Sequence, residues 1–323
     1  MKAVIHQGFG GTEVLSWEDR ALPEFGPTEL LVDVRAAGVN RADILQRSGL
    51  YPPPPGESEV LGLEIAGVVV DLGAEVRGFA VGDRVCGLVA GGGYAERCRL
   101  DAGLAFPIPD TWSFAQAAAV PEVFMTANEN LIELGGLQPG ETALIHAGGS
   151  GVGSTAIQMA VHLGVATYTT TGSPEKVARC EALGVAMAIN YKTQSFAEEI
   201  AARCKGVDVV LDFVGARYLA DNLGLLRRRG RLVVVGLLGG RKAELDLGLV
   251  LRRQLTIKGS VMRSLPLADK IAIKNRFEDR WWDLLVAGTL CPLVHAEIPM
   301  AAAAQAHRMM EESAHFGKIV LVR

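Results

Sequence analysis

The chain has 323 residues, of which 49% are hydrophobic and 21% charged, so it is long enough for two domains with a sizeable core. Its formal net charge of −4 argues against a nucleic-acid partner or an anionic membrane surface. The five cysteines are widely spaced and form no C-x-x-C, which favours a reduced cytoplasmic protein over a disulfide framework or a zinc lobe. The first residues lack the apolar segment of a signal peptide, and no run approaches the roughly 20 apolar residues that cross a bilayer.

The part of the chain before about residue 110 is predicted to be rich in β-structure. Glycine-containing turn signals separate short apolar runs, as in an antiparallel sheet. The expected strands are Lys2–His6, Glu29–Ala36, Ile65–Leu72, Val81–Val89 and Tyr94–Leu100. The segment YPPPPGES, residues 51–58, contains four prolines, which lack backbone donors, so it is expected to be a stiff surface loop.

From about residue 112 the pattern changes to alternating strand and helix signals. The runs near 142–146, 207–213 and 231–236 are apolar throughout, as expected for strands buried on both faces. The expected helices between the strands are Gly151–Leu163, Pro174–Leu183, Phe196–Cys204 and Arg217–Leu226. This alternation predicts a doubly wound parallel sheet, with six strands in the order 3-2-1-4-5-6.

After Val261 the alternation stops. The pattern then predicts a long helix over Ala268–Ala287, a second helix over Met300–Ser313 and an apolar strand over Lys318–Val322. We expect this tail to return to the N-terminal β-rich domain. The fold class is therefore α/β, with a β-rich domain and a parallel-sheet domain.

A glycine-rich turn in TALIHAGGSGVGSTAIQ joins the first strand of the parallel sheet to the helix that follows. The dinucleotide fingerprint G-x-G-x-x-G fits here only as Gly148, Ser150 and Gly153, with serine at the central glycine. Gly151 and Val152 open the helix, whose unpaired amide groups and positive dipole end are suited to a pyrophosphate. The alternative is a glycine-rich turn that binds no ligand. Ser150 is tolerable if its φ is negative, and its hydroxyl is then free to point at a phosphate or at the nicotinamide.

The second strand of the parallel sheet ends in Gly172-Ser173-Pro174 and lacks the acidic residue that usually holds the ribose in NAD enzymes. Ser173 and Lys176 form an anion site where an adenosine 2′-phosphate would lie, which favours NADPH over NADH. The simpler interpretation is a well-capped helix, with Ser173 as the N-cap. Glu175 would oppose a phosphate if its side chain pointed inward.

No set of metal ligands is apparent in the sequence. The six histidines are scattered along the chain, and no Ser-His-Asp arrangement follows from their spacing. His146 lies at a strand end, where a structural histidine with satisfied hydrogen bonds is more common than a catalytic one.

Several motifs together resemble the zinc-free quinone oxidoreductase branch of the medium-chain dehydrogenase/reductase superfamily. They are AAGVNRADILQRSGLYPPPP, VLGLEIAGVVVDLG, VGDRVCGL, QAAAVPEVFMTA, LIHAGGSGVG and FGKIVL, and they run in order along the whole chain. The resemblance implies a GroES-like catalytic domain over residues 1–120, completed by 262–323, and a Rossmann domain over 121–261, with NADPH in the cleft between them.

Zinc-dependent relatives place a cysteine where this chain has Asn40 and a histidine where it has Leu63, so no metal is expected. The resemblance then implies direct hydride transfer from NADPH to a quinone or a conjugated enone, which needs little Lewis-acid help. In this branch the turn around Ser150 is a familiar variant of the fingerprint.

The resemblance also implies a set of site residues. The residues expected to bind the cofactor are Asn40, Thr126, Gly148, Ser150, Gly151, Val152, Gly153, Gly172, Ser173, Lys176, Tyr191 and Lys318. Tyr51, Asn40 and Ser150 are the candidate catalytic residues. Tyr51 either donates to the reduced oxygen or anchors the proline loop, and Asn40 either polarises the acceptor or holds the cleft loop. Tyr191 either contacts the adenosine end of the cofactor or is only a strand-end aromatic.

The expected function is NADPH-dependent quinone reduction on a small-molecule acceptor. The alternatives are an enoyl or alkenal reductase and an NADPH-binding protein with little turnover, because the fold alone does not separate them. The strand expected over 254–261 would be a sheet edge with Ile257 and Val261 on an apolar side, which predicts a homodimer through this edge.

Overall fold

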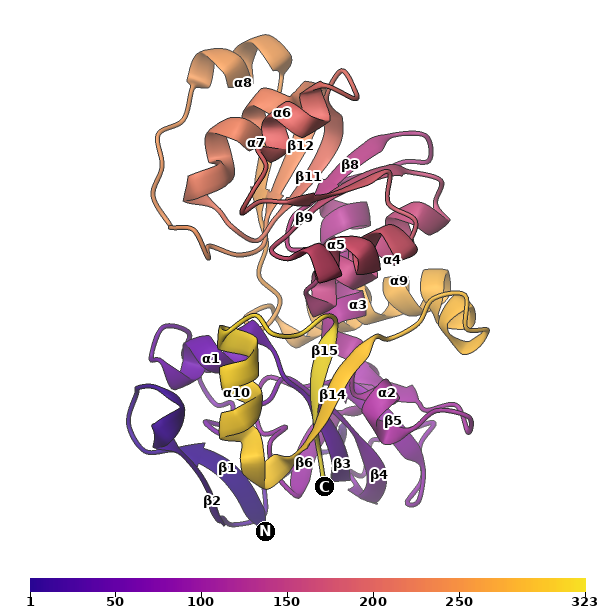
Figure 1. Ribbon diagram of the computed structural model, residues 1–323. Helices are drawn as coiled ribbons and strands as arrows, with labels where there is room; N and C mark the ends of the chain where they lie inside the picture. The colour runs from indigo at the N-terminus through magenta and orange to yellow at the C-terminus, as the bar shows by residue number, and fades with distance from the viewer. The chain divides into compact units, whose positions relative to one another are not determined.

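The computed structural model describes residues 1–323, which divide into two compact units. The first unit consists of Met1–Val123 and Arg263–Arg323, and the second of Phe124–Met262. Both chain termini therefore belong to the first unit, as the indigo and yellow segments in Figure 1 show. No helix is both long enough and apolar enough to span a membrane.

The first unit is built on a seven-stranded sheet with the order β14-β15-β3-β4-β5-β7, in which β6 also pairs with β3. Its strands are β3 (Glu29–Gly38), β4 (Glu64–Leu72), β5 (Arg84–Leu88), β6 (Arg97–Asp101), β7 (Ala105–Pro107), β14 (Val294–Pro299) and β15 (Lys318–Val322). All pairs are antiparallel except β14 with β15. The hairpin of β1 (Lys2–His6) and β2 (Leu15–Asp19) is separate. A core of buried aliphatic side chains, among them Val32, Ile65 and Leu321, holds the sheet together.

The return of the tail is confirmed, because β15 pairs with β3 and places Leu321 opposite Ala37. Other expectations were wrong in detail. The strand expected from Val81 begins only at Arg84, because Gly82 adopts a φ of +99° in the preceding turn. Helix α1 (Arg41–Arg47) was not expected, since seven residues are too few to show a helical period.

Three further helices of the first unit are short, and one is long. The short ones are α2 (Phe114–Ala117), α3 (Pro121–Asn128) and α10 (Ala303–Glu311), and the long one is α9 (Leu267–Val286). Helix α3 continues into the second unit. Single 3₁₀ turns lie at Thr12–Val14, Ala102–Leu104 and Met300–Ala302. The 20-residue α9 buries Phe277 and Trp281, and Trp282 stacks on Phe106 with ring centroids 4.7 Å apart.

The second unit contains the expected parallel sheet. Its strands are β8 (Thr142–Ile145), β9 (Ala166–Thr171), β10 (Met187–Asn190), β11 (Val207–Asp212), β12 (Leu226–Val234) and β13 (Thr256–Gly259). Their order, β10-β9-β8-β11-β12-β13, is the predicted 3-2-1-4-5-6, and every pair is parallel. The α/β fold class is thus confirmed.

Helices connect these strands, and polar side chains cap four of them. They are α4 (Gly151–His162), α5 (Pro174–Ala182), α6 (Phe196–Ala201), α7 (Leu219–Leu225) and α8 (Leu247–Arg253). A 3₁₀ turn (Ala216–Tyr218) precedes α7, and a π-helical turn (Glu129–Leu134) follows α3. The helix expected over Arg217–Leu226 is shorter, because Leu226 already pairs with β11 as the first residue of β12. The pairing of β12 with β11 is then interrupted after Leu226 and resumes at Arg231.

Candidate active site

The glycine-rich turn between β8 and α4 is tight enough to require glycine at two positions. A Cβ atom on Gly148 would lie 2.2 Å from the Thr169 hydroxyl oxygen. A Cβ atom on Gly153 would lie 2.2 Å from the carbonyl oxygen of Ala147. The helix therefore packs directly against the turn, as the first βα unit of a dinucleotide-binding fold requires.

Ser150 is the N-cap of α4. Its φ is −77°, so a side chain is tolerated at the central position of the fingerprint, and its Oγ accepts a hydrogen bond from the Gly153 amide at 3.0 Å. Because the cap uses only the oxygen of Ser150, the hydroxyl proton remains available to a ligand. The amide groups of Gly151 and Val152, in the first turn of α4, have no acceptor within the helix. A 12-residue helix thus presents its positive end beside the carboxyl end of β8.

At the end of β9 the structure brings together Gly172, Ser173 and Tyr191. Ser173 caps α5, because its Oγ accepts from the Lys176 amide at 3.3 Å. The Tyr191 amide donates to Thr171 at 3.1 Å, and its phenol lies so close to Gly172 that a Cβ atom there would be 2.7 Å from the phenol oxygen. Tyr191 nevertheless remains 45% exposed, so part of its side chain is accessible to a ligand.

The same strand end carries a positive charge that was not predicted from the sequence. Burial lowers the pKa of Lys176 most, and the nearby cations Lys192 and Arg179 lower it further, whereas Cys180 and Glu175 raise it. Two further cations and one carboxylate, Glu175, are therefore near enough to Lys176 to act on its charge. Lys192 was missed, although its place directly after Tyr191, beside β9, was the available signal.

Thr126 lies on α3 and is 6% exposed. Its hydroxyl oxygen is buried and has no hydrogen-bond partner. A buried hydroxyl without a partner is unfavourable unless a ligand satisfies it, so the residue fits a role in binding a polar group.

His146 has the structural role that was expected. It is fully buried, with Nδ1 2.9 Å from the Thr170 hydroxyl and Nε2 2.7 Å from Oδ1 of Asn222. Burial is the main cause of its lowered pKa. Both ring nitrogens are therefore engaged inside the sheet.

In the first unit, Asn40 and Lys318 belong to one buried hydrogen-bond network centred on Glu64. Asn40 donates through Nδ2 to Glu64 Oε1 at 2.9 Å and accepts from Lys318 Nζ at 2.8 Å. The Lys318 ammonium, 3% exposed, also donates to the Val39 carbonyl at 2.9 Å and to Glu64. All three donors of Lys318 are thus used within the protein.

This network connects distant parts of the chain. Glu64, which is fully buried, also accepts from the Glu122 amide at the start of α3, at 2.9 Å. It was not predicted as a site residue. The available signal was a carboxylate in the otherwise apolar run VLGLEIAGVVV, since a buried carboxylate requires partners.

Tyr51 lies in the proline loop and is half-buried, and its hydroxyl makes no hydrogen bond within the protein. Burial raises the pKa of Tyr51 most, Glu122 raises it further and Arg263 lowers it. The Tyr51 phenol is thus a neutral donor on which groups of opposite charge act.

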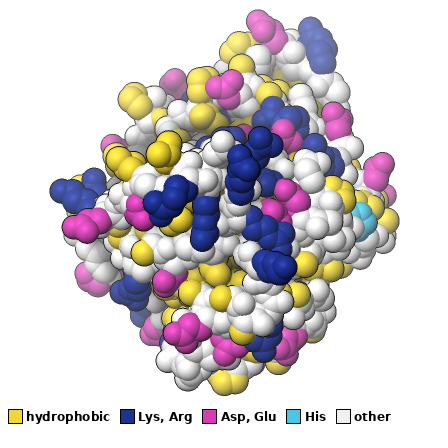
Figure 2. Space-filling view, turned by 90° about the horizontal axis from the view of Figure 1, so that it is seen from above, with side chains coloured by type: hydrophobic (Ala, Val, Ile, Leu, Met, Phe, Trp, Pro, Cys, Tyr) yellow, Lys and Arg dark blue, Asp and Glu magenta, His cyan; other side chains and the backbone are white.

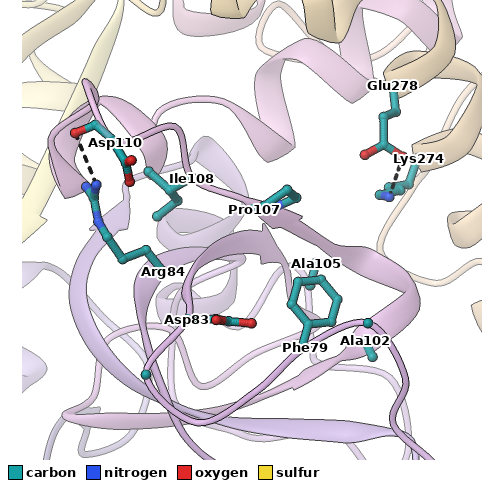
Figure 3. A pocket seen from close by; sticks show the side chains of 12 residues that line it. Phe79, Asp83, Arg84, Ala102, Ala105, Pro107, Ile108, Asp110, Lys274 and Glu278 are labelled. Carbon is teal, nitrogen blue, oxygen red and sulfur yellow. Dashed lines mark hydrogen bonds and ion pairs between the residues drawn. The ribbon is translucent and has the colours of Figure 1, made fainter.

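Two surface pockets contain none of the predicted site residues. One, of about 630 Å³, lies in the first unit, where Lys274 pairs with Glu278 and Arg84 donates to the Asp110 carbonyl (Figure 3). The other, of about 530 Å³, lies in the second unit beside Lys205, Arg228 and Arg253. Figure 2, which shows the side of α6, α7 and α8, displays many Lys and Arg side chains.

No group of three or more His, Cys, Asp and Glu side chains is arranged to hold a metal ion. All five cysteines are free. At the two positions where zinc-dependent relatives were expected to supply ligands, the chain has the amide of Asn40, engaged by Glu64 and Lys318, and the buried Leu63.

Comparison with known proteins identifies both units. Residues 26–110 match the alcohol dehydrogenase GroES-like domain, and residues 151–282 match the family described as zinc-binding dehydrogenase. The rat quinone oxidoreductase is 31% identical over 331 residues, which cover 100% of this chain and 98% of the relative. The polyketide synthase GfsB of Streptomyces halstedii is 38% identical over 91% of this chain.

The chain spans only 5% to 14% of the length of the polyketide synthases that it matches. Among solved structures, Escherichia coli quinone oxidoreductase in complex with NADPH aligns with a TM-score of 0.90 at 29% identity, with full coverage of both chains. The CurK enoyl reductase aligns with a TM-score of 0.86 at 28% identity, covering 99% of this chain and 98% of that one.

These relatives define an oxidoreductase class with a GroES-like and a Rossmann unit. The chain belongs to the medium-chain dehydrogenase/reductase superfamily, in the branch that contains the quinone oxidoreductases.

Proposed function

We propose that this chain is an NADPH-dependent oxidoreductase that delivers hydride to a quinone without a metal ion. One observation carries the cofactor assignment: β9 itself ends without an acidic residue, and a cluster of Lys176, Lys192 and Arg179 follows it, with Glu175 as the one carboxylate among them. A 2′-phosphate carries about two negative charges, which such a cluster stabilises and a ribose hydroxyl does not require. The NADPH in the E. coli relative agrees with this assignment.

The residues of the second unit fit the parts of the cofactor in order. Gly148 and Gly153 allow close approach to the pyrophosphate, and the first-turn amides of α4 donate to it. Ser173, Lys176 and Tyr191 hold the adenosine end, and the unsatisfied hydroxyl of Thr126 binds the carboxamide end. NADPH, when bound, supplies a hydride and leaves as NADP⁺.

On the acceptor side, the hydroxyl of Tyr51 is not engaged by a hydrogen bond within the protein. Asn40 is better suited to holding its loop than to polarising the acceptor, because Glu64 and Lys318 already engage its amide. The same holds for Lys318, whose donors all face the protein. The GroES-like unit would then shape the acceptor site without contributing a Lewis acid.

A second candidate function is reduction of an enone or an enoyl thioester. The likeness to the CurK enoyl reductase and to polyketide synthases favours it. A conjugated enone accepts hydride at carbon and develops charge on oxygen, as a quinone does, so the same groups would serve both reactions. A third candidate, an NADPH-binding protein with little turnover, is separated from these only by rates.

Turnover with a panel of quinones and a panel of enones and enoyl thioesters, each with NADPH and with NADH, tests the proposal. We expect quinone reduction with NADPH to have the highest kcat/KM. A higher value for an enone or a thioester would assign the second function. Tight NADPH binding without turnover on either panel would assign the third.

A further inference from the structure

Arg263, in the segment between β13 and α9, is a buried cation with an unused donor. Only 6% of the residue is exposed. Its Nε donates to the Ala90 carbonyl at 2.7 Å, and its Nη1 points to the Tyr51 carbonyl at 3.5 Å. Its Nη2 is buried and has no partner, and Arg263 forms no ion pair within 4.0 Å.

Such an arrangement is unfavourable without a ligand. Burial lowers the pKa of Arg263, whereas Asp43, Tyr51, Glu122 and Glu57 raise it through space without a direct bond. A buried charged donor that lacks a hydrogen-bond partner loses its hydration and regains nothing. Because Ala90 and Tyr51 fix the plane of the guanidinium, the direction of Nη2 is also fixed, which makes it a preorganised donor.

A second free donor lies beside it. The guanidinium carbon of Arg263 is 5.6 Å from the centre of the Tyr51 ring, and the Tyr51 hydroxyl makes no hydrogen bond within the protein. One side chain pair thus offers a phenol and a guanidinium N–H, both without an acceptor in the protein. Two neighbouring donors without acceptors are suited to an oxygen atom on which charge develops.

We propose that Nη2 of Arg263 binds the carbonyl oxygen of the electron acceptor beside the Tyr51 hydroxyl, in a site that selects uncharged acceptors. The inference rests on the proposed function. Hydride addition brings two electrons to the acceptor ring or double bond, its carbonyl oxygen takes up the displaced electron pair, and a solvent proton then neutralises that oxygen. The guanidinium stabilises the oxygen while it is anionic.

The preference for uncharged acceptors follows from the charges around this donor. The carboxyl groups of Asp43, Glu57 and Glu122 act on Arg263 through space, and the buried Lys270 is the further cation beside it, with Nζ 3.5 Å from the Arg263 carbonyl oxygen. The group therefore has more acidic than basic side chains. An acceptor that brought its own carboxylate would add like charge in a poorly solvated place, which is unfavourable.

The first test uses the unmodified protein and a matched pair of acceptors. The pair is 2-(2-carboxyethyl)-1,4-naphthoquinone and its methyl ester, in which the saturated spacer keeps the two rings equally electrophilic. We expect kcat/KM for the ester to exceed that for the acid at least tenfold at pH 8. Equal rates, or faster reduction of the acid, would overturn the selectivity for uncharged acceptors.

The second test uses Arg263→Met and Arg263→Lys, with Arg203→Gln as a control at an exposed position in the turn after α6. We expect Arg263→Met to lose about 10- to 100-fold in kcat with the ester, because a charge-assisted bond to the developing oxyanion is lost. KM for the ester and Kd for NADPH should change less than threefold. Arg263→Lys should recover part of kcat, whereas the control should match the unmodified protein.

The outcomes separate the two levels of the proposal. If the unmodified protein reduces no quinone and no enone, the proposed function fails and this inference fails with it. If it reduces the ester but Arg263→Met retains kcat, or loses kcat and NADPH binding equally, only the role of Arg263 is refuted. Should Arg263→Met not fold, Arg263→Lys and the ester–acid pair still decide the question.

Discussion

At the scale of single residues, the polar side chains of the Rossmann unit have local roles that also prepare the site. Ser150 and Ser173 cap α4 and α5, and each does so with the oxygen lone pair, which leaves the proton for a ligand. A helix cap and a phosphate contact therefore do not exclude one another. The phosphate contacts themselves are proposals, which substitutions can test.

Lys176→Ala should lower the preference for NADPH over NADH by about 10- to 150-fold, since a charge-assisted contact contributes roughly 1.5–3 kcal/mol. The measurement is kcat/KM for both cofactors. Ser173→Ala, the matched comparison, should change the preference less but lower the free energy of unfolding by about 1 kcal/mol through its cap. Equal weakening of NADH and NADPH by Lys176→Ala would refute the assignment of the 2′-phosphate site.

We expect Glu122→Gln to raise the free energy of unfolding above that of the unmodified chain at pH 8. At pH 4.5 this gain should be smaller or absent. Burial, above all, raises the pKa of Glu122 to about 7 from 4.5. The folded state therefore holds this proton more tightly than the unfolded state, and stability falls as pH rises from 4.5 through 7. Above pH 7 the ionised carboxylate costs about 1–2 kcal/mol once solvent screening is allowed for, and glutamine removes that cost.

Urea unfolding of both proteins at the two pH values measures this difference. The exposed Glu24→Gln serves as a control that should show no pH-dependent change. A stability difference of the same size at pH 4.5 and pH 8 would contradict the titration of Glu122 in this range.

At the scale of elements, the contact between α4 and β8 depends on the absence of side chains in the turn. Gly153 is held against the carbonyl of Ala147, a backbone atom that cannot move aside cheaply. Gly224, near the end of α7, faces open space and has no positive φ. The two glycines therefore predict opposite effects of the same substitution.

Gly153→Ala should lower the free energy of unfolding by more than about 2 kcal/mol, because a Cβ atom 2.2 Å from a carbonyl oxygen forces the helix away from the strand. Gly224→Ala should instead raise it by about 0.5–1 kcal/mol through helix propensity. Thermal or urea unfolding measures both. A neutral Gly153→Ala would mean that the turn relaxes without cost and that close packing there is not required.

At the scale of the whole molecule, the parallel sheet ends in an open edge. All four residues of β13 are exposed and only β12 pairs with it, so one row of backbone groups is free. Ile257 and Val261 are 39% and 57% exposed, and the neighbouring helix α8 exposes Leu247 and Leu251. We propose that a second copy of the chain covers this edge in a two-fold dimer.

Light scattering at micromolar concentration should give the mass of a dimer. Ile257→Lys should shift the protein toward the monomer, because a charge on an edge strand blocks strand pairing. Val286→Lys makes the same change at a 47% exposed position of α9 and should leave the mass unaltered. A monomeric unmodified protein would refute the dimer.

Metal analysis tests the zinc-free mechanism. Asn40 and Leu63 offer no ligand atoms of the kind that zinc prefers, so we expect no stoichiometric zinc and no loss of activity with a chelator. Tightly bound zinc at one ion per chain would contradict this mechanism. Partial loss of activity with EDTA that added zinc restores would do the same.

Much of the Rossmann unit could be predicted from the sequence, because its signals are local. Buried parallel strands are continuous apolar runs, and the N-caps Ser150 and Ser173 mark where α4 and α5 begin. The right-handed βαβ connection then leaves few possible strand orders. The return of Lys318–Val322 to the first unit was predictable from the break in the alternation. Short elements such as α1 and β2 escaped, since so few residues show no period.

The partners of the charged groups were decided only by the tertiary structure. Lys318 meets Asn40 and Glu64 across more than 250 positions of sequence, and Arg263 meets Tyr51 across 212. Hydrophobic periodicity specifies which face of an element is buried, but not which buried charge stands opposite another. The pairing of buried charges depends on strand register and on the packing of distant segments. The contacts of Asn40, Glu64 and Lys318 therefore follow from the registers of β3, β4 and β15 and could not be predicted from the sequence.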